Sequence, residues 1–129
     1  MIKIETGSSI FLIEKSDIEL GIREIRKRSG IPVQSNGIYR LYDKNGTLLY
    51  IGMGGKILNR VFVHMRGKSP NTSGYYHEIE WAEIHTLPLY RRSKTEELEQ
   101  FLIKMLNPKY NELKWSGYTI MNMIKYFEI

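Results

Sequence analysis

The sequence predicts a single α/β domain, and three observations lead to this prediction. A β-hairpin signal lies in the middle of the 129-residue chain, where two apolar and aromatic stretches flank an Asn-Gly turn. Two later stretches repeat apolar residues at the 3.6-residue spacing of an amphipathic helix. No internal repeat, low-complexity tract or linker divides the chain, so residues 1–129 are expected to form one domain with one core.

The N-terminal part is expected to supply a strand and a helix. Residues 1–13 are compatible with a strand. The polar pair Ser16 and Asp17 is suited to cap a helix that runs to about Arg28. Gly30 follows this stretch and is expected to stop the helix.

The predicted hairpin pairs residues 38–42 with residues 48–51 as antiparallel strands. Between them, Asn45 and Gly46 supply the positive φ angles that a tight hairpin turn requires. This signal is the clearest local one in the sequence, and it predicts which two strands lie side by side.

Helical and strand patterns continue after the hairpin, in the order helix, strand, helix, helix. These elements are predicted over residues 56–66, 80–85, about 93–107 and 119–127. Ser93, with Glu96 three positions later, forms a capping box at the start of the second helix, and Pro108 ends that helix.

Composition excludes several kinds of site. The chain has no cysteine, which excludes disulfides, thiolate nucleophiles and cysteine-ligated zinc. It has no signal-like apolar start and no run of about 18 apolar residues, so a soluble, cytoplasmic protein without membrane contact is expected. The net charge of +5 favours anionic partners.

Positive charge is concentrated in residues 44–77, which include no Asp or Glu. Aromatic side chains are interspersed with the basic ones. This combination can follow a phosphate backbone, and it equally fits a solvated basic face. The candidate nucleic-acid-binding residues are Lys44, Lys56, Arg66 and Lys68, with Arg60 among them.

Short motifs give the most specific signal. Gly-Ile-Tyr at residues 37–39, ten further residues and Tyr-Ile-Gly at residues 50–52 resemble the signature of the GIY-YIG nucleases. The catalytic domain of that family occurs in excision-repair nuclease subunits and phage homing endonucleases. Further matches in family order cover residues 59–64, 99–104 and 108–111. The resemblance spans about residues 36–112 of the chain.

The resemblance implies an α/β fold in which a small three-stranded antiparallel sheet is flanked by helices. It also implies a metal-dependent endonuclease that hydrolyses phosphodiester bonds, with DNA favoured over RNA as the substrate. One Mg²⁺ or Mn²⁺ ion per site is the implied cofactor. The implied catalytic residues are Tyr39, Tyr50, Arg60, His64, Glu99 and Asn111.

Glu99 is the predicted metal ligand, and its place on the helix supports this independently. Leucines surround its direction on a helical wheel, whereas Glu96 and Glu97 project further toward solvent. A carboxylate on the apolar side is costly to bury unless it is paired or bound to a cation. Mg²⁺ needs few protein oxygens, because water and substrate phosphate supply the rest.

The other candidate residues have separate expected roles. Arg60 and His64 lie one helical turn apart at the edge of the apolar stripe, where one can grip a phosphate and the other can share protons. Tyr39 and Tyr50 reach one groove if both leave the same sheet face. Tyr39 is favoured for orienting or deprotonating water, which requires nearby cations to lower its pKa. Asn111 either orients a phosphate oxygen or closes a turn.

Several questions stay open at this point. Met53 stands where some relatives of the family have a lysine, so the source of an assisting positive charge is undecided, and Lys56 is the nearest ammonium group. A non-catalytic nucleic-acid-binding module on the same scaffold, or an interaction protein with a basic face, is the competing hypothesis. Since the chain is short, weak sequence preference or specificity lent by a protein partner is expected.

Overall fold

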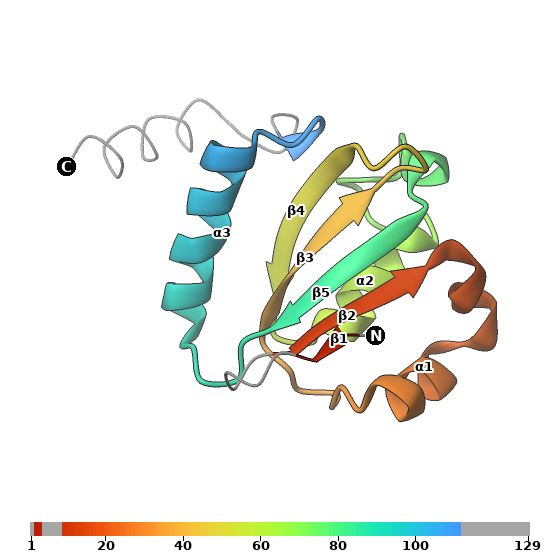
Figure 1. Ribbon diagram of the computed structural model, residues 1–129, viewed down its shortest axis with the longest axis horizontal. Helices are drawn as coiled ribbons and strands as arrows, with labels where there is room; N and C mark the ends of the chain where they lie inside the picture. The colour runs from red at the N-terminus through yellow and green to blue at the C-terminus, as the bar shows by residue number, and fades with distance from the viewer. Residues whose placement is uncertain (1, 4–8, 112–129) are drawn as a thin grey trace.

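An antiparallel sheet of five strands forms the centre of the computed structural model, which describes residues 2–3 and 9–111 (Figure 1). The strands follow the order β1-β2-β5-β3-β4 across the sheet. Their bounds are Ile2–Lys3 for β1, Ser9–Glu14 for β2, Gly37–Tyr42 for β3, Leu48–Gly54 for β4 and Trp81–Thr86 for β5. The predicted α/β class with an antiparallel sheet is therefore confirmed.

The sheet is wider than the three strands that were expected. The hairpin strands β3 and β4 and the third predicted strand, β5, form one part of it. The N-terminal stretch adds the rest, because it holds two antiparallel strands and not one. β2 pairs with β5 along its whole length, from Ser9 opposite Thr86 to Glu14 opposite Trp81. It thereby occupies the edge of β5 that β3 leaves open.

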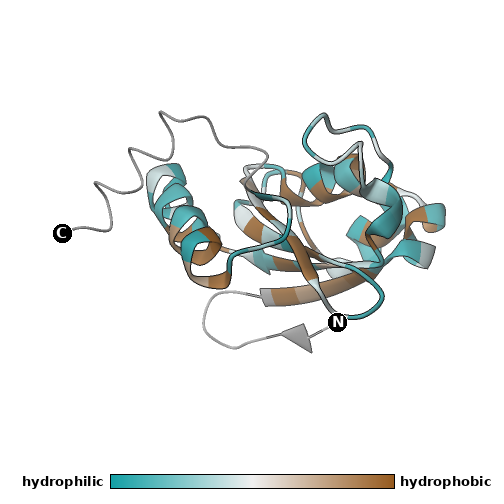
Figure 2. Ribbon diagram, turned by 90° about the horizontal axis from the view of Figure 1, so that it is seen from above, coloured by the Kyte–Doolittle hydropathy of each residue, from teal (hydrophilic) through white to brown (hydrophobic). Residues whose placement is uncertain are grey.

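Helices cover both faces of this sheet. α1 (Ile22–Ser29) and α2 (Ile57–Met65) lie on one face, and α3 (Arg92–Leu106) lies on the other (Figures 1 and 2). Two short 3₁₀ helices, η1 (Lys15–Leu20) and η2 (Tyr76–Glu78), precede α1 and β5. α2 confirms the amphipathic helix predicted after the hairpin. None of the described helices has the length and apolar character needed to cross a membrane.

Alternation along β3 assigns its side chains to two separate cores, one on each face of the sheet, so the expectation of a single core is wrong. Tyr39 and Leu41 belong to the larger core, which α1 and α2 cover. Ile38 belongs to the smaller core, where it packs with Ile51 of β4 and Ile103 of α3. The two-residue period of a strand produces this division.

The predicted helix that ends near residue 28 is divided in two. Gly21 interrupts it with a φ of +86°, so a 3₁₀ helix ends there and α1 starts after it. Asp17 does act at the N-terminus, where its carboxylate accepts the backbone N–H of Glu14 at 2.9 Å. Gly30 follows the last residue of α1 with a φ of +73°, which confirms it as the stop.

The hairpin turn lies where it was predicted, but its backbone conformation differs from the predicted one. Among its residues only Gly46 has a positive φ, of 83°. The Asp43 carboxylate accepts the N–H groups of Asn45 and Thr47, each at 2.9 Å, and so stabilises the remainder of the turn. The expectation that Asn45 also has a positive φ is therefore wrong.

α3 starts at Arg92, one residue before the predicted cap. Ser93 therefore lies inside the first turn, and its predicted capping box with Glu96 does not form. The helix ends before Pro108, as predicted. The helix predicted over residues 119–127 lies outside the described residues.

Candidate active site

Tyr39 lies at the centre of the candidate site, opposite a glycine of the neighbouring strand. In the β3–β4 register, Tyr39 pairs with Gly52. A Cβ atom at position 52 would lie 2.1 Å from the Tyr39 hydroxyl oxygen and 2.3 Å from its Cζ atom. Glycine at this position thus lets the Tyr39 ring lie across β4. The Gly-Ile-Tyr and Tyr-Ile-Gly motifs meet through this contact.

A buried hydrogen-bonded chain connects Tyr39 to α2 and to the loop that follows it. The Tyr39 hydroxyl lies 2.5 Å from Nε2 of His64, and Nδ1 of His64 lies 2.8 Å from the Thr72 hydroxyl. None of the three side chains is more than 1% exposed. Since a neutral imidazole has one donor and one acceptor nitrogen, Tyr39 and Thr72 hold the two ends of one path for a proton.

The prediction that His64 lies at the edge of the apolar stripe is wrong. Its imidazole is completely buried together with the apolar residues of α2. A helical wheel assigns a polar side chain to the edge, but here both ring nitrogens have hydrogen-bond partners inside the protein, which makes burial tolerable. Thr72 is the partner of Nδ1, and no local sequence pattern marks that residue.

Tyr50 lies beside this hydrogen-bonded chain. Its ring centroid is 6.2 Å from that of Tyr39 and 5.4 Å from that of His64. The condition that the two tyrosines leave the same sheet face is therefore met. Both rings are 1% exposed, so they lie below the surface and not along an open groove.

The surroundings of Tyr39 keep its hydroxyl protonated. Burial, followed by the neighbouring Tyr50, holds the pKa of Tyr39 well above its ordinary value. Interaction with the Arg60 guanidinium lowers the pKa of Tyr39, and the Glu99 carboxylate raises it. Arg60 and Glu99 therefore both act on Tyr39, from α2 and α3. The nearby cation that a base role requires is present, but burial outweighs its effect.

Glu99 lies on the inner side of α3, where its helical position predicts it. It is 6% exposed, whereas Glu96 and Glu97 are exposed to solvent. Across residues 2–3 and 9–111, no group of three His, Cys, Asp or Glu side chains is arranged to hold a metal ion. One buried carboxylate suits Mg²⁺ or Mn²⁺, which keep water and substrate oxygens as ligands, and does not suit zinc.

An open cleft of about 450 Å³ adjoins Arg60, and we call it the basic cleft. The end of β4, the first turns of α2 and the start of α3 line it. Lys56, Arg60 and Arg92 contribute positive charge, and no carboxylate from residues 2–3 or 9–111 is part of the lining. Lys56 therefore lines the same cleft as Met53 and can supply the positive charge that Met53 lacks. Sequence patterns missed Arg92, because only the packing of α3 brings it here.

The structure separates the predicted nucleic-acid-binding residues. Lys56 lines the basic cleft. Lys44 lies in the hairpin turn, at the opposite end of β4 from Gly54. Arg66 and Lys68 follow the C-terminal end of α2 and are exposed there. Their contact with nucleic acid stays a prediction.

Asn111 is buried against the edge of β4. Its Oδ1 atom accepts the N–H of Ile51 at 2.7 Å, and its Nδ2 atom donates to the Ile51 carbonyl at 2.8 Å. The backbone N–H groups of Lys109 and Tyr110 also donate to β4, at 3.1 and 2.9 Å. The Asn111 amide is thus engaged at both ends, and it positions the strand segment that follows Tyr50.

Comparison with known proteins gives matches in the same part of the chain. UvrABC system protein C of Legionella pneumophila (strain Lens) is 38% identical over 81 residues. The protein of the same name from Helicobacter hepaticus is 36% identical over 93 residues. These matches cover 60% and 64% of this chain but only 12% and 14% of the relatives, so the chain spans a small part of their length.

A solved structure is also similar. The N-terminal GIY-YIG endonuclease domain of UvrC from Thermotoga maritima, bound to magnesium, is 27% identical in sequence, with a TM-score of 0.49. The similarity covers 68% of this chain and 96% of that one. A family model of the UvrC-like GIY-YIG domain matches residues 35–112, a range that includes every predicted catalytic residue. By this match, the chain belongs to the family of UvrC-like GIY-YIG domains.

Proposed function

We propose that the chain is a divalent-metal-dependent endonuclease that hydrolyses phosphodiester bonds in DNA. The observation that carries the proposal is that the buried Tyr39 hydroxyl is hydrogen-bonded to His64, while Arg60, one turn earlier on the same helix as His64, lines the basic cleft. Glu99 is buried on the inner side of α3. Metal-assisted phosphodiester hydrolysis uses a group that handles a proton, a cation for the phosphate and a ligand for the metal ion. Tyr39, Arg60 and Glu99 supply one of each, and family membership supports the same activity.

In the proposed reaction, water attacks phosphorus in line with the leaving oxygen. A new P–O bond forms as the old one breaks, the attacking water gives up a proton, and the leaving oxygen takes up a proton from solvent water. Because the pKa of Tyr39 is raised, its hydroxyl can accept that proton only while it passes its own to Nε2 of His64, 2.5 Å away. His64 then becomes an imidazolium whose Nδ1–H donates to Thr72.

Arg60 neutralises the negative charge on the phosphate in this proposal. A guanidinium can donate two parallel hydrogen bonds to non-bridging oxygens. Glu99 would hold one Mg²⁺ or Mn²⁺ ion, which when bound stabilises charge on the phosphate and the leaving oxygen as a Lewis acid. Lys56 and Arg92 extend the positive potential along the cleft and favour the approach of a nucleic-acid strand.

The proposed enzyme is one nuclease domain across residues 1–129. The family match accounts for residues 35–112, and β2 and α1 pack onto the same sheet and core. The cations of the basic cleft suit phosphate groups, which are common to all sequences. We therefore propose weak sequence preference, or specificity lent by a protein partner. The relatives are named as components of a UvrABC system, which is consistent with a partner.

A cleavage assay tests this function. Purified protein with Mg²⁺ or Mn²⁺ should cut at least one of four matched substrates: single-stranded DNA, duplex DNA, branched DNA and RNA. Chelation with EDTA should stop the reaction. Glu99→Gln should be inactive, and Glu97→Gln, an exposed position on the same helix, is its matched control. DNA binding without cleavage in either metal would establish the non-catalytic binding module instead.

A further inference from the structure

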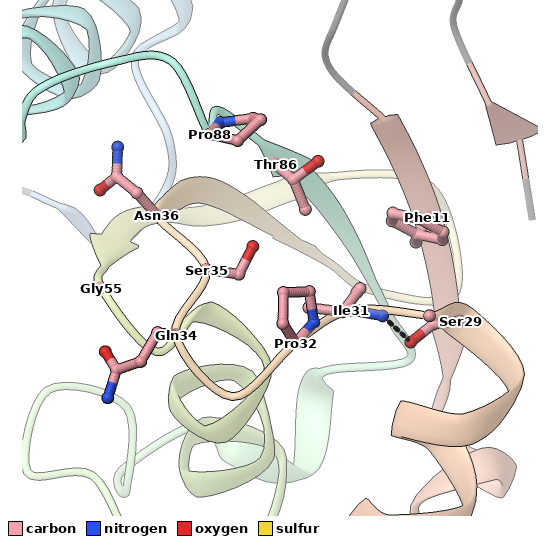
Figure 3. A pocket seen from close by; sticks show the side chains of 11 residues that line it. Phe11, Ser29, Ile31, Pro32, Gln34, Ser35, Asn36, Gly55, Thr86 and Pro88 are labelled. Atoms are coloured by element: carbon pink, nitrogen blue, oxygen red, sulfur yellow. Dashed lines mark hydrogen bonds between the residues drawn. The ribbon is translucent and has the colours of Figure 1, made fainter.

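A second hollow adjoins the basic cleft, and its chemistry is different. It has a volume of about 500 Å³, within the range of ligand pockets in proteins. The loop between α1 and β3 forms one side, and β2 and the end of β5 form the other (Figure 3). We call it the side pocket. Phe11, Ile31, Pro32, Ser35, Thr86 and Pro88 are among the residues that line it.

The side pocket and the basic cleft differ in charge. Among the residues that the structure describes, no Lys, Arg, His, Asp or Glu lines the side pocket, whereas three basic side chains and no acidic one line the basic cleft. Apolar surface from Ile31, Pro32 and Pro88 is combined with the polar groups of Gln34 and Ser35. An uncharged ligand with apolar faces and polar edges matches this lining, and a phosphate group does not.

The two hollows share a wall. Gly55 lines both of them. The N–H of Ser35 donates to the Gly55 carbonyl at 3.0 Å, and the Ser35 carbonyl accepts the N–H of Ile57 at 3.1 Å. This wall is therefore a hydrogen-bonded piece of backbone, with a glycine at the point where both hollows meet. A strand of nucleic acid whose phosphate lies in the basic cleft can therefore extend the neighbouring group of the strand past Gly55 into the side pocket.

We propose that the side pocket binds one unpaired nucleobase of the strand whose phosphates lie in the basic cleft. This inference rests on the proposed function and deepens it. A nucleobase is uncharged, stacks on apolar surface and presents hydrogen-bonding edges. Its faces and its Watson–Crick edge are inaccessible while it is stacked and paired within a duplex, so the base must be single-stranded or displaced from the helix. The enzyme would therefore prefer DNA that is unpaired next to the cut.

The test blocks the pocket from its exposed rim and measures binding without metal. Gln34→Trp and Pro88→Trp place a large ring at the rim, where both residues are exposed. Val33→Trp is the matched control, since Val33 lies in the same loop, is 46% exposed and does not line the pocket. Fluorescence anisotropy in EDTA gives the Kd for single-stranded and for fully paired DNA. Circular dichroism confirms that each variant is folded.

Both rim variants should weaken the binding of single-stranded DNA by about tenfold, the scale of one lost stacked base, and leave paired DNA unchanged. Val33→Trp should bind both as the wild type does. A series of single-stranded DNAs, each with one abasic site at a different position, locates the bound base. At one position the abasic site should weaken binding to the wild type but not to Gln34→Trp. Equal effects on paired and single-stranded DNA, or no sensitive abasic position, would overturn the proposal. Since no metal is present, neither result depends on whether the protein cleaves.

Discussion

Replacing Gly52 with alanine would put a methyl group where the Tyr39 ring lies. Distances of 2.1 and 2.3 Å to the Tyr39 hydroxyl oxygen and Cζ atom are far below contact distance, so the ring must move. Overpacking of this kind costs about 1–3 kcal/mol, and loss of the hydrogen bond to His64 costs about 1 kcal/mol more. Alanine restricts the unfolded chain and offsets about 0.5 kcal/mol of this cost. We expect a net destabilisation of about 1.5–3.5 kcal/mol.

Urea unfolding of Gly52→Ala, followed by circular dichroism, measures this loss. Gly74→Ala is the control, because its added Cβ would meet no atom within 4 Å. The cleavage rate of Gly52→Ala should fall by about 10²-fold even where the protein is fully folded, since Tyr39 is displaced from its partners. Tyr39→Leu should reduce the cost of the alanine, because it removes the colliding atoms. A Gly52→Ala protein with wild-type stability and rate would refute the contact.

Four further changes test the remaining parts of the site. Glu99→Gln should abolish cleavage in single-turnover assays, while the Kd for DNA in EDTA stays within about twofold; a large loss of binding would contradict a role in chemistry. Arg60→Ala should lower the cleavage rate by about 10²-fold, and Arg60→Lys should recover only part of it. Asn111→Ala leaves the N–H and carbonyl of Ile51 without their partners and should cost about 2–4 kcal/mol in urea unfolding. Because the pKa of Tyr39 is raised in the folded state, its contribution to stability is constant below about pH 10 and falls above it, by up to about 1.4 kcal/mol per pH unit. Tyr39→Phe should remove that component of the fall when unfolding is measured between about pH 9 and pH 11.

Local patterns in the sequence were sufficient to predict the elements that short-range interactions determine. The β3–β4 hairpin and α2 follow from alternation and helical spacing, and both are confirmed. The pairing of β2 with β5 was not predictable in the same way, because it joins Ser9 to Thr86 across most of the chain. Gly21 also has a conformation that sequence leaves open, since glycine is tolerated inside a helix as well as between helices.

The same difference between local and long-range signals applies to the candidate site. The inward direction of Glu99 follows from one helical wheel, and the shared face of Tyr39 and Tyr50 follows from strand alternation. The burial of His64 depends on Thr72, which comes from a loop without periodicity. Contacts between elements that are distant in the sequence were therefore inaccessible to pattern analysis, while the hairpin pairing and the direction of a side chain within one element were accessible.

The segment at residues 109–111 has a consequence for solubility. β4 is the last strand on its side of the sheet, and the free backbone groups of such a strand can pair with a strand of another molecule. Lys109, Tyr110 and Asn111 occupy four of those groups, on Leu48, Leu49 and Ile51, through hydrogen bonds to β4. The same residues that hold β4 in position thus also shield it from edge-to-edge aggregation. Selection on either property acts on both.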